Sequence, residues 1–207
     1  MKHSPLATLA LASAAALSLA ACATGPGPVE VTRFHDPARL QAAQRGTVSV
    51  TAAPGLTDTL ALAPYSAAVS EELRRLGYSV SGDSPVVGTS RYRAEVRVER
   101  FARGADGGRS PVSVGVGGST GSYGSGLGLG IGINLGGGGG PRVGTELAVT
   151  LRDTTTNASV WEGRAEVDYP ARSDFAQPRA NADALAEALF REFPGNNGET
   201  VRVSVDR

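Results

Sequence analysis

The sequence has few of the residues that usually build catalytic, metal or disulfide sites. It contains 1 cysteine and 2 histidines in 207 residues, and 5% of its residues are aromatic. A single cysteine, Cys22, excludes any disulfide within the chain. After the first few residues, His35 is the one remaining histidine, so no Cys or second His can join it in a zinc-type site. We therefore expect neither a metal nor a cofactor.

Lysine is nearly absent, because Lys2 is followed by no other lysine and all later cationic residues are arginine. Arginine is suited to bidentate binding of anions. However, Ala, Gly and Pro are also plentiful, so the bias of a GC-rich genome explains the arginines better. The formal net charge is +0 at pH 7. This balance predicts neither nucleic-acid binding nor a polybasic membrane patch.

Recognisable catalytic motifs are also lacking. No acidic cluster has the spacing of a calcium loop. The glycine runs lack the Lys-Ser/Thr pair of a phosphate loop. The segment 121–126 resembles a nucleophile elbow in its small residues alone. A Ser-His-Asp site that uses His35 is not excluded by residue order, but nothing marks its nucleophile. We expect a protein that is not an enzyme.

The apolar runs are too short for a membrane-spanning helix, which needs about 20 residues. The first residues instead have the parts of a secretory signal: Lys2 and His3 begin it, and an Ala- and Leu-rich run covers 6–19. A retained membrane anchor is the alternative. The run ends in Leu19-Ala20-Ala21-Cys22, which resembles the lipobox of bacterial lipoproteins.

That resemblance implies a diacylglyceryl group on Cys22 and signal-peptidase cleavage between Ala21 and Cys22. Two or more acyl chains give stable membrane anchoring. Ala23 follows the cysteine where Asp would favour the inner membrane, so the lipoprotein sorting rule points to the outer membrane. We expect residues 1–21 to be a signal peptide and 22–28 a Pro/Gly tether. The protein would face the periplasm as part of the cell envelope.

Residues 29–207 have the size and patterning of a single α+β domain. Alternating apolar residues predict strands, and apolar residues at helical spacing predict two helices, over 64–76 and 181–193. Asn181 is expected as the cap of the second helix, and Trp161 as a core residue. We predict an antiparallel sheet with both helices packed on one face. The strands are expected at 29–34, 47–52, 78–81, 91–103, 143–151, 159–169 and 201–205.

Strand 91–103 carries charged residues on one side, which has two interpretations. One is an anion-binding sheet face. The other is a solvated face whose charges pair with one another, and the glutamates among the arginines favour it.

The segment 110–140 is rich in glycine but keeps a period of two, because Leu127, Leu129 and Ile131 alternate with glycines. A flexible linker has no reason to keep this period, so we predict a β-hairpin. Repeated glycine in a strand often marks a close approach by another segment. The hairpin would extend the sheet, pack against a partner or a second copy, or enter a membrane as part of an assembly.

Four short segments resemble, in their order along the chain, bacterial lipoproteins that carry the domain of unknown function 4136. They are residues 31–35 (Val-Thr-Arg-Phe-His), 76–78 (Leu-Gly-Tyr), 161–163 (Trp-Glu-Gly) and 193–198 (Phe-Pro-Gly-Asn-Asn-Gly). The resemblance implies an α+β domain without established catalytic residues.

The function expected from these features is that of a non-enzymatic envelope lipoprotein that contacts another envelope component. The alternatives are a periplasmic module that binds a small ligand or lipid, and an oligomeric, membrane-associated assembly that uses the glycine-rich hairpin.

Overall fold

The computed structural model describes residues 27–42, 46–56, 59–81, 90–103, 109–110 and 142–205. The predictions for Ala21, Cys22 and the glycine-rich hairpin lie outside these residues. Within them, no helix is both long enough and apolar enough to cross a membrane.

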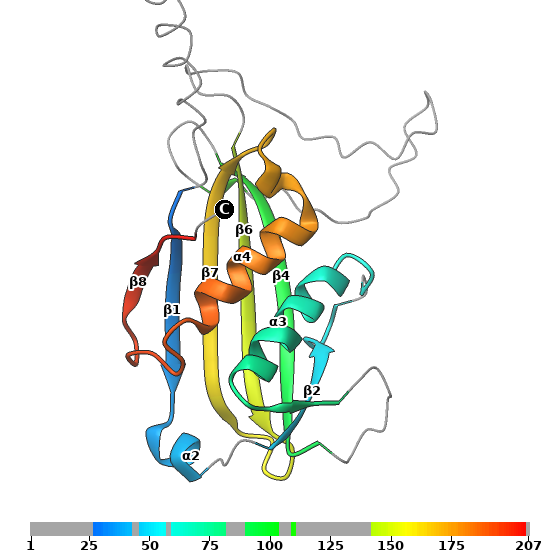
Figure 1. The fold of residues 1–207 in the computed structure, drawn as a ribbon, viewed down its shortest axis with the longest axis vertical. Helices are drawn as coiled ribbons and strands as arrows, with labels where there is room; N and C mark the ends of the chain where they lie inside the picture. The colour runs from blue at the N-terminus through cyan, green and yellow to red at the C-terminus, as the bar shows by residue number, and fades with distance from the viewer. Residues whose placement is uncertain are drawn as a thin grey trace, which may run out of the picture.

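The fold is dominated by one sheet of eight strands (Figure 1). Seven strands follow the order β3-β2-β4-β6-β7-β1-β8, and β5 pairs with the end of β4. The strands are β1 (Val29–His35), β2 (Thr47–Ala52), β3 (Ser79–Val80), β4 (Tyr92–Arg103), β5 (Arg109–Ser110), β6 (Arg142–Asp153), β7 (Ser159–Pro170) and β8 (Thr200–Val203). The predicted strands are thus confirmed within a few residues at each end.

The sheet is mixed, which corrects the prediction of a purely antiparallel sheet. Strand β2 runs parallel to both β3 and β4, whereas the remaining pairs are antiparallel. The reason is the helix between β2 and β3, since a helical crossover returns the chain to the end of the sheet where β2 began. The strand that follows then runs in the same direction as β2.

Two longer helices, α3 (Ala63–Arg75) and α4 (Pro178–Phe190), pack against each other and lie over the same face of the sheet (Figure 1). Helix α3 contacts β2, β3 and β4, and α4 contacts β1, β6 and β7. The short helix α2 (Pro37–Ala42) follows β1, and a 3₁₀ turn, η2 (Asp174–Ala176), precedes α4. The α+β class therefore holds, with more sheet than helix.

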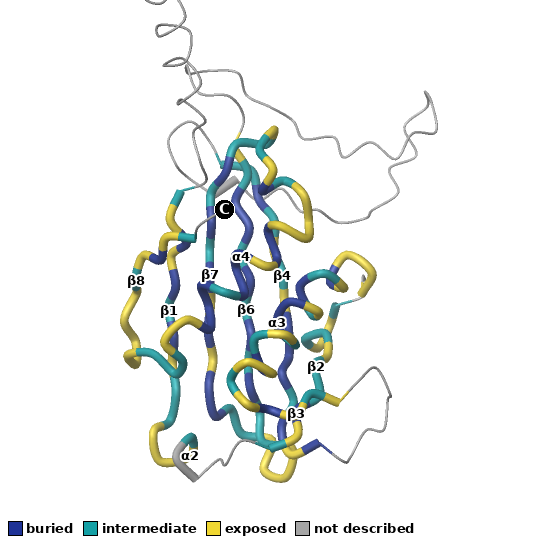
Figure 2. Tube along the Cα trace, in the orientation of Figure 1, coloured by how far each residue is buried: buried dark blue, intermediate teal, exposed yellow. Residues whose placement is uncertain are grey.

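The core lies between this pair of helices and the sheet. Alternate residues of the central strands are buried, as Figure 2 shows along β6 and β7. Trp161 is 1% exposed, which confirms it as a core residue. The largest fully buried side chains include Trp161, Tyr65, Tyr92, Tyr169, Leu73, Leu147, Leu151, Leu185 and Leu189.

The capping residues expected from the sequence are found at α3 but not at the start of α4. After α3, Gly77 has φ +88°, and the amides of Gly77 and Tyr78 donate to the carbonyls of Arg74 and Leu73, a Schellman motif. Helix α4 begins at Pro178 rather than at Asn181, because proline suits the first helical turn. Asn181 is wholly buried, and its Oδ1 accepts a hydrogen bond from the Tyr65 hydroxyl at 2.9 Å, so its prediction as a cap is wrong.

The two ends of the sheet carry different parts of the chain. At one end, which we call the tether end, the Gly27 amide donates to the Asp168 carbonyl at 3.3 Å. At the same end, Arg103 of β4 lies opposite Arg109 of β5 and Arg142 of β6 in the strand register. The opposite end, the turn end, holds His35 and the β6–β7 turn at residues 154–158. The chain thus enters the domain beside both borders of the glycine-rich segment.

Candidate functional site

The four segments that carry the family resemblance meet in space at the C-terminus of α4. We call this group the motif cluster. It is formed by Arg33, Tyr78, Trp161, Gly163, Phe193, Pro194 and Gly195. Segments up to about 160 positions apart in the chain therefore form one contact network.

Arg33 is the polar centre of the motif cluster. It is 4% exposed, and its guanidinium donates to the carbonyls of Leu189 at 2.9 Å, Ala188 at 2.9 Å and Arg191 at 2.7 Å. These are carbonyls at the end of α4, which a helix leaves without internal partners. Burial lowers the pKa of the Arg33 guanidinium, and the nearby Glu192 carboxylate raises it. Arg33 thus attaches α4 to β1.

Trp161 joins β7 to the chain that follows α4. Its indole stacks on Phe190 with ring centroids 5.3 Å apart, contacts Phe193 at 5.2 Å and donates Nε1–H to the Pro194 carbonyl at 3.1 Å. Tyr78, which follows α3, meets Phe193 edge to face at 6.5 Å. Such aromatic pairs stabilise beyond the area that they bury.

Two glycines leave room for these side chains. A Cβ at Gly163 would lie 2.4 Å from the Trp161 ring and 2.8 Å from Leu189, and one at Gly195 would lie 2.5 Å from Arg33 Cδ. Gly195 also has φ +80°, where a side chain is strained. The motif cluster is therefore a packing and hydrogen-bond unit.

A surface hollow of 390 Å³ borders the motif cluster at the turn end. This volume lies within the range of small-ligand pockets. No Lys or Arg of the described chain lines it, whereas two carboxylates do. Its lining includes Phe34, His35, Asp36, Trp161, Glu162 and Asn197.

His35 lines this hollow opposite Trp161 in the β1–β7 register. Its amide donates to Asn197 Oδ1 at 3.0 Å, which fixes the backbone. Its Nδ1 atom is buried and has no hydrogen-bond partner among the described residues. No nucleophile–histidine hydrogen bond occurs there within the described chain.

The sheet face away from α3 and α4 is charged, and most of its charges are paired. One row across four strands consists of Glu99, Glu146, Glu166 and Glu30. Glu30 pairs with Arg202 at 3.0 Å, Glu166 with Arg103, and Glu99 with Arg97 at 3.7 Å. Like charges in opposed positions destabilise a sheet unless they are compensated. The prediction of a face with mutually paired charges is confirmed for Glu30, Glu99 and Glu166.

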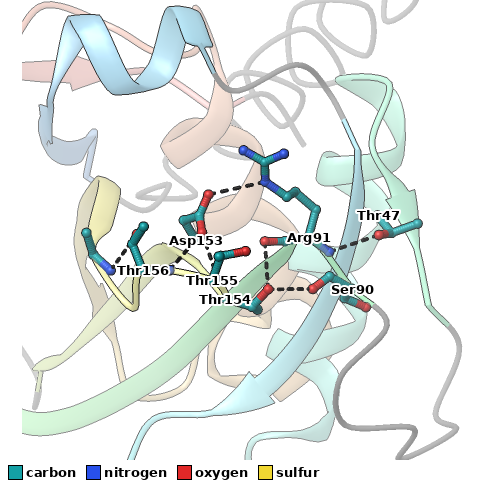
Figure 3. Close-up of polar contacts among 8 residues, drawn as sticks. Thr47, Ser90, Arg91, Asp153, Thr154, Thr155 and Thr156 are labelled. Atoms are coloured by element: carbon teal, nitrogen blue, oxygen red, sulfur yellow. Dashed lines mark hydrogen bonds and ion pairs between the residues drawn. The ribbon is translucent and has the colours of Figure 1, made fainter.

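The turn end also holds a dense polar network between β4 and the β6–β7 turn (Figure 3). Asp153 Oδ1 accepts from the amides of Thr155 at 2.8 Å and Thr156 at 3.1 Å, and Oδ2 pairs with Arg91 Nε at 3.2 Å. The backbone hydrogen bond from Thr156 is the main cause that lowers the pKa of Asp153. Burial opposes it, and the hydrogen bonds from Thr155 and Arg91 lower the pKa further. Thr154 Oγ1 donates to the carbonyl of Ser90 at 2.8 Å. The network rigidifies the turn.

Among the described residues, no group of three or more His, Cys, Asp or Glu is placed to hold a metal ion. Sequence reasoning missed Arg33 as a structural residue. Its signal was an arginine at an inward position of β1, after Val29 and Val31. Sequence reasoning also missed the hollow, because its lining comes from three separate parts of the chain.

Comparison with known proteins gives one sequence relative and two solved structures of interest. No family model matches the chain. The PelC dodecamer from Paraburkholderia phytofirmans has a TM-score of 0.42 and 18% identity, covering 76% of this chain and 91% of that chain. A PDZ domain protein from Parabacteroides distasonis has a TM-score of 0.45 and 11% identity, covering 93% of this chain and 42% of that one. Likenesses at this level carry no statement about the present protein.

The sequence relative is nearer. Uncharacterized protein ZMO1243 of Zymomonas mobilis is 33% identical over 218 residues, which cover 85% of this chain and 80% of the relative. The chain therefore belongs to the family of uncharacterized protein ZMO1243.

Proposed function

We propose that this protein is a non-enzymatic lipoprotein of the bacterial envelope, anchored through Cys22 in the outer membrane and facing the periplasm. Its role is to contact another envelope component with the end of the domain that lies away from the lipid. Two further statements belong to this proposal. The chain is a member of the lipoproteins with the domain of unknown function 4136, and its residues 110–140 form a glycine-rich hairpin.

The observation that carries the proposal is the placement of the chain's entry relative to the hollow. Gly27 enters at the tether end, and five residue steps separate it from Cys22, a reach of about 17 Å for extended chain. The hollow and the polar β6–β7 turn lie at the other end of strands 12 residues long. A lipid on Cys22 would hold the tether end at the membrane and leave the turn end open to a partner.

A second candidate function is the binding of a small ligand. The hollow supports it, because its volume suits such a ligand and its lining combines aromatic and polar side chains.

In-cell photocrosslinking tests the leading proposal. A photoreactive amino acid replaces Thr155, which is exposed at the tip of the β6–β7 turn, and in a matched strain it replaces Arg172, exposed at the tether end. We expect Thr155 to give a crosslink to one defined envelope protein and Arg172 to give none to that protein. A protein that forms no crosslink from the turn end, or the same crosslink from both ends, would contradict the proposal.

A further inference from the structure

The hollow at the turn end has the chemistry of a cation site. Phe34 and Glu162 are directly opposed on β1 and β7, so both side chains point to the same sheet face. Phe34 is 51% exposed, one of two large apolar residues in the described chain with such exposure. An exposed ring thus stands beside an exposed carboxylate at the rim of a concave surface.

The carboxylate of Glu162 is available for a ligand. It forms no ion pair or side-chain hydrogen bond with any other described residue, unlike Glu166 and Glu95 on the same face. The second carboxylate of the lining, Asp36, is occupied. Its Oδ1 accepts from the amides of Ala38 at 3.0 Å and Arg39 at 3.2 Å, and its Oδ2 pairs with Arg39 Nε at 3.1 Å.

The ring of Phe34 lies against the turn that contains Gly198. A Cβ added to Gly198 would lie 3.7 Å from Phe34 Cε1, so one part of the ring lies over this glycine. The Gly198 amide donates to the Arg33 carbonyl at 2.8 Å, which fixes the turn beneath the ring to the motif cluster. An aromatic ring next to a free carboxylate binds a cation through its π face and through charge at once.

We propose that the hollow receives an arginine side chain of the partner protein, which pairs with Glu162 and stacks on Phe34. This inference rests on the proposed partner contact and names its chemistry. Arginine fits better than a compact ammonium, because its planar guanidinium can stack on the ring while its N–H groups pair with the carboxylate. Asn197, whose Oδ1 accepts from the His35 amide, adds polar lining.

The test is a peptide titration of the full-length chain in detergent, followed by NMR of backbone amides. The probe is acetyl-Gly-Arg-Gly-amide, and the neutral probe is the same peptide with citrulline. We expect the arginine peptide to shift the amides of Phe34, His35 and Glu162, and the citrulline peptide to bind at least about tenfold more weakly. Equal binding of both peptides, or no binding of the arginine peptide, would overturn the inference.

Matched variants locate the site. Glu162→Gln should weaken binding of the arginine peptide by about tenfold, whereas Glu99→Gln, on the same sheet face, should change it by less than about twofold. Both variants remove one negative charge, so equal losses would mean general attraction and would contradict a site at the hollow. Phe34→Leu keeps the apolar volume and should weaken binding by about two- to fivefold; an unchanged affinity would contradict stacking.

The outcomes separate this inference from the proposed function. A Thr155 crosslink without peptide binding would overturn the cation site and leave the partner contact standing. Peptide binding without any Thr155 crosslink would support the cation site and overturn the envelope contact.

Discussion

At the scale of single residues, we expect buried polar groups to contribute more to folding stability than exposed charges do. Arg33 is buried yet satisfied by three carbonyls, whereas His35 has an unpaired buried Nδ1. Exposed ion pairs such as Arg202–Glu30 are typically worth under about 1 kcal/mol. Arg33, which lies in one of the segments that carry the family resemblance, therefore has a structural role that is independent of any chemistry at the hollow.

Replacing Arg33 tests this structural role. Arg33→Met should lower the free energy of unfolding by about 3 kcal/mol or more, because it leaves carbonyls at the end of α4 without donors in a buried place. The measurement is urea unfolding followed by Trp161 fluorescence. Arg202→Met is the matched control on an exposed strand and should cost under about 1 kcal/mol. Equal losses in both variants would contradict the capping role.

Asp153 gives a pH prediction. Its pKa is lowered in the folded protein, so it stabilises the fold above its unfolded pKa of about 3.9, and this contribution is lost as pH falls through the folded pKa. Asp153→Asn should therefore reduce stability at pH 7 and make little difference well below pH 4. The measurement is the urea midpoint of the unchanged protein and of Asp153→Asn, from pH 7 to below pH 4. A difference between the two midpoints that stays constant with pH would count against the Asp153 network.

At the scale of elements, the alternation of apolar residues was enough to place most strands. Thr47–Ala52 matches its prediction at both ends, and the strands predicted at 143–151 and 159–169 are found as β6 and β7, longer by no more than two residues at either end. Direction was not predictable in the same way, since alternation does not distinguish a parallel from an antiparallel neighbour. The start of α4 was missed because Asn181 has the residue type of a cap but lies one turn inside, where Tyr65 pairs with it.

Gly163 tests the packing of β7 under α4. Gly163→Ala should lower the free energy of unfolding by about 1–3 kcal/mol, because the new Cβ would overlap the Trp161 ring and Leu189. Gly27→Ala is a suitable comparison, since its Cβ would lie 3.6 Å from the Asp168 carbonyl oxygen, an ordinary contact. The measurement is the thermal unfolding midpoint of each variant. A smaller decrease for Gly163→Ala than for Gly27→Ala would contradict close packing of β7 under α4.

At the scale of the whole molecule, the described domain has a tether end and a turn end, and they differ in what they can contact. The α+β class was predictable from periodicity and length. The motif cluster and the hollow were not, because they assemble segments near residues 33, 77, 162 and 195 that only the folded chain brings together. The sheet face away from α3 and α4 was predictable as charged, but which of its described charges remain unpaired, Glu162 among them, depends on the register.

Lipid attachment at Cys22 is the claim on which the orientation of these ends depends. It is tested most directly by mass spectrometry of the full-length protein expressed in a bacterium that processes lipoproteins and extracted from its membranes. We predict a chain that begins at Cys22 and carries a diacylglyceryl group on that sulfur, and a Cys22→Ala protein that keeps residues 1–21 and carries no lipid. A membrane-extracted chain with an unmodified Cys22 thiol would contradict the anchor, and with it the outward orientation of the turn end.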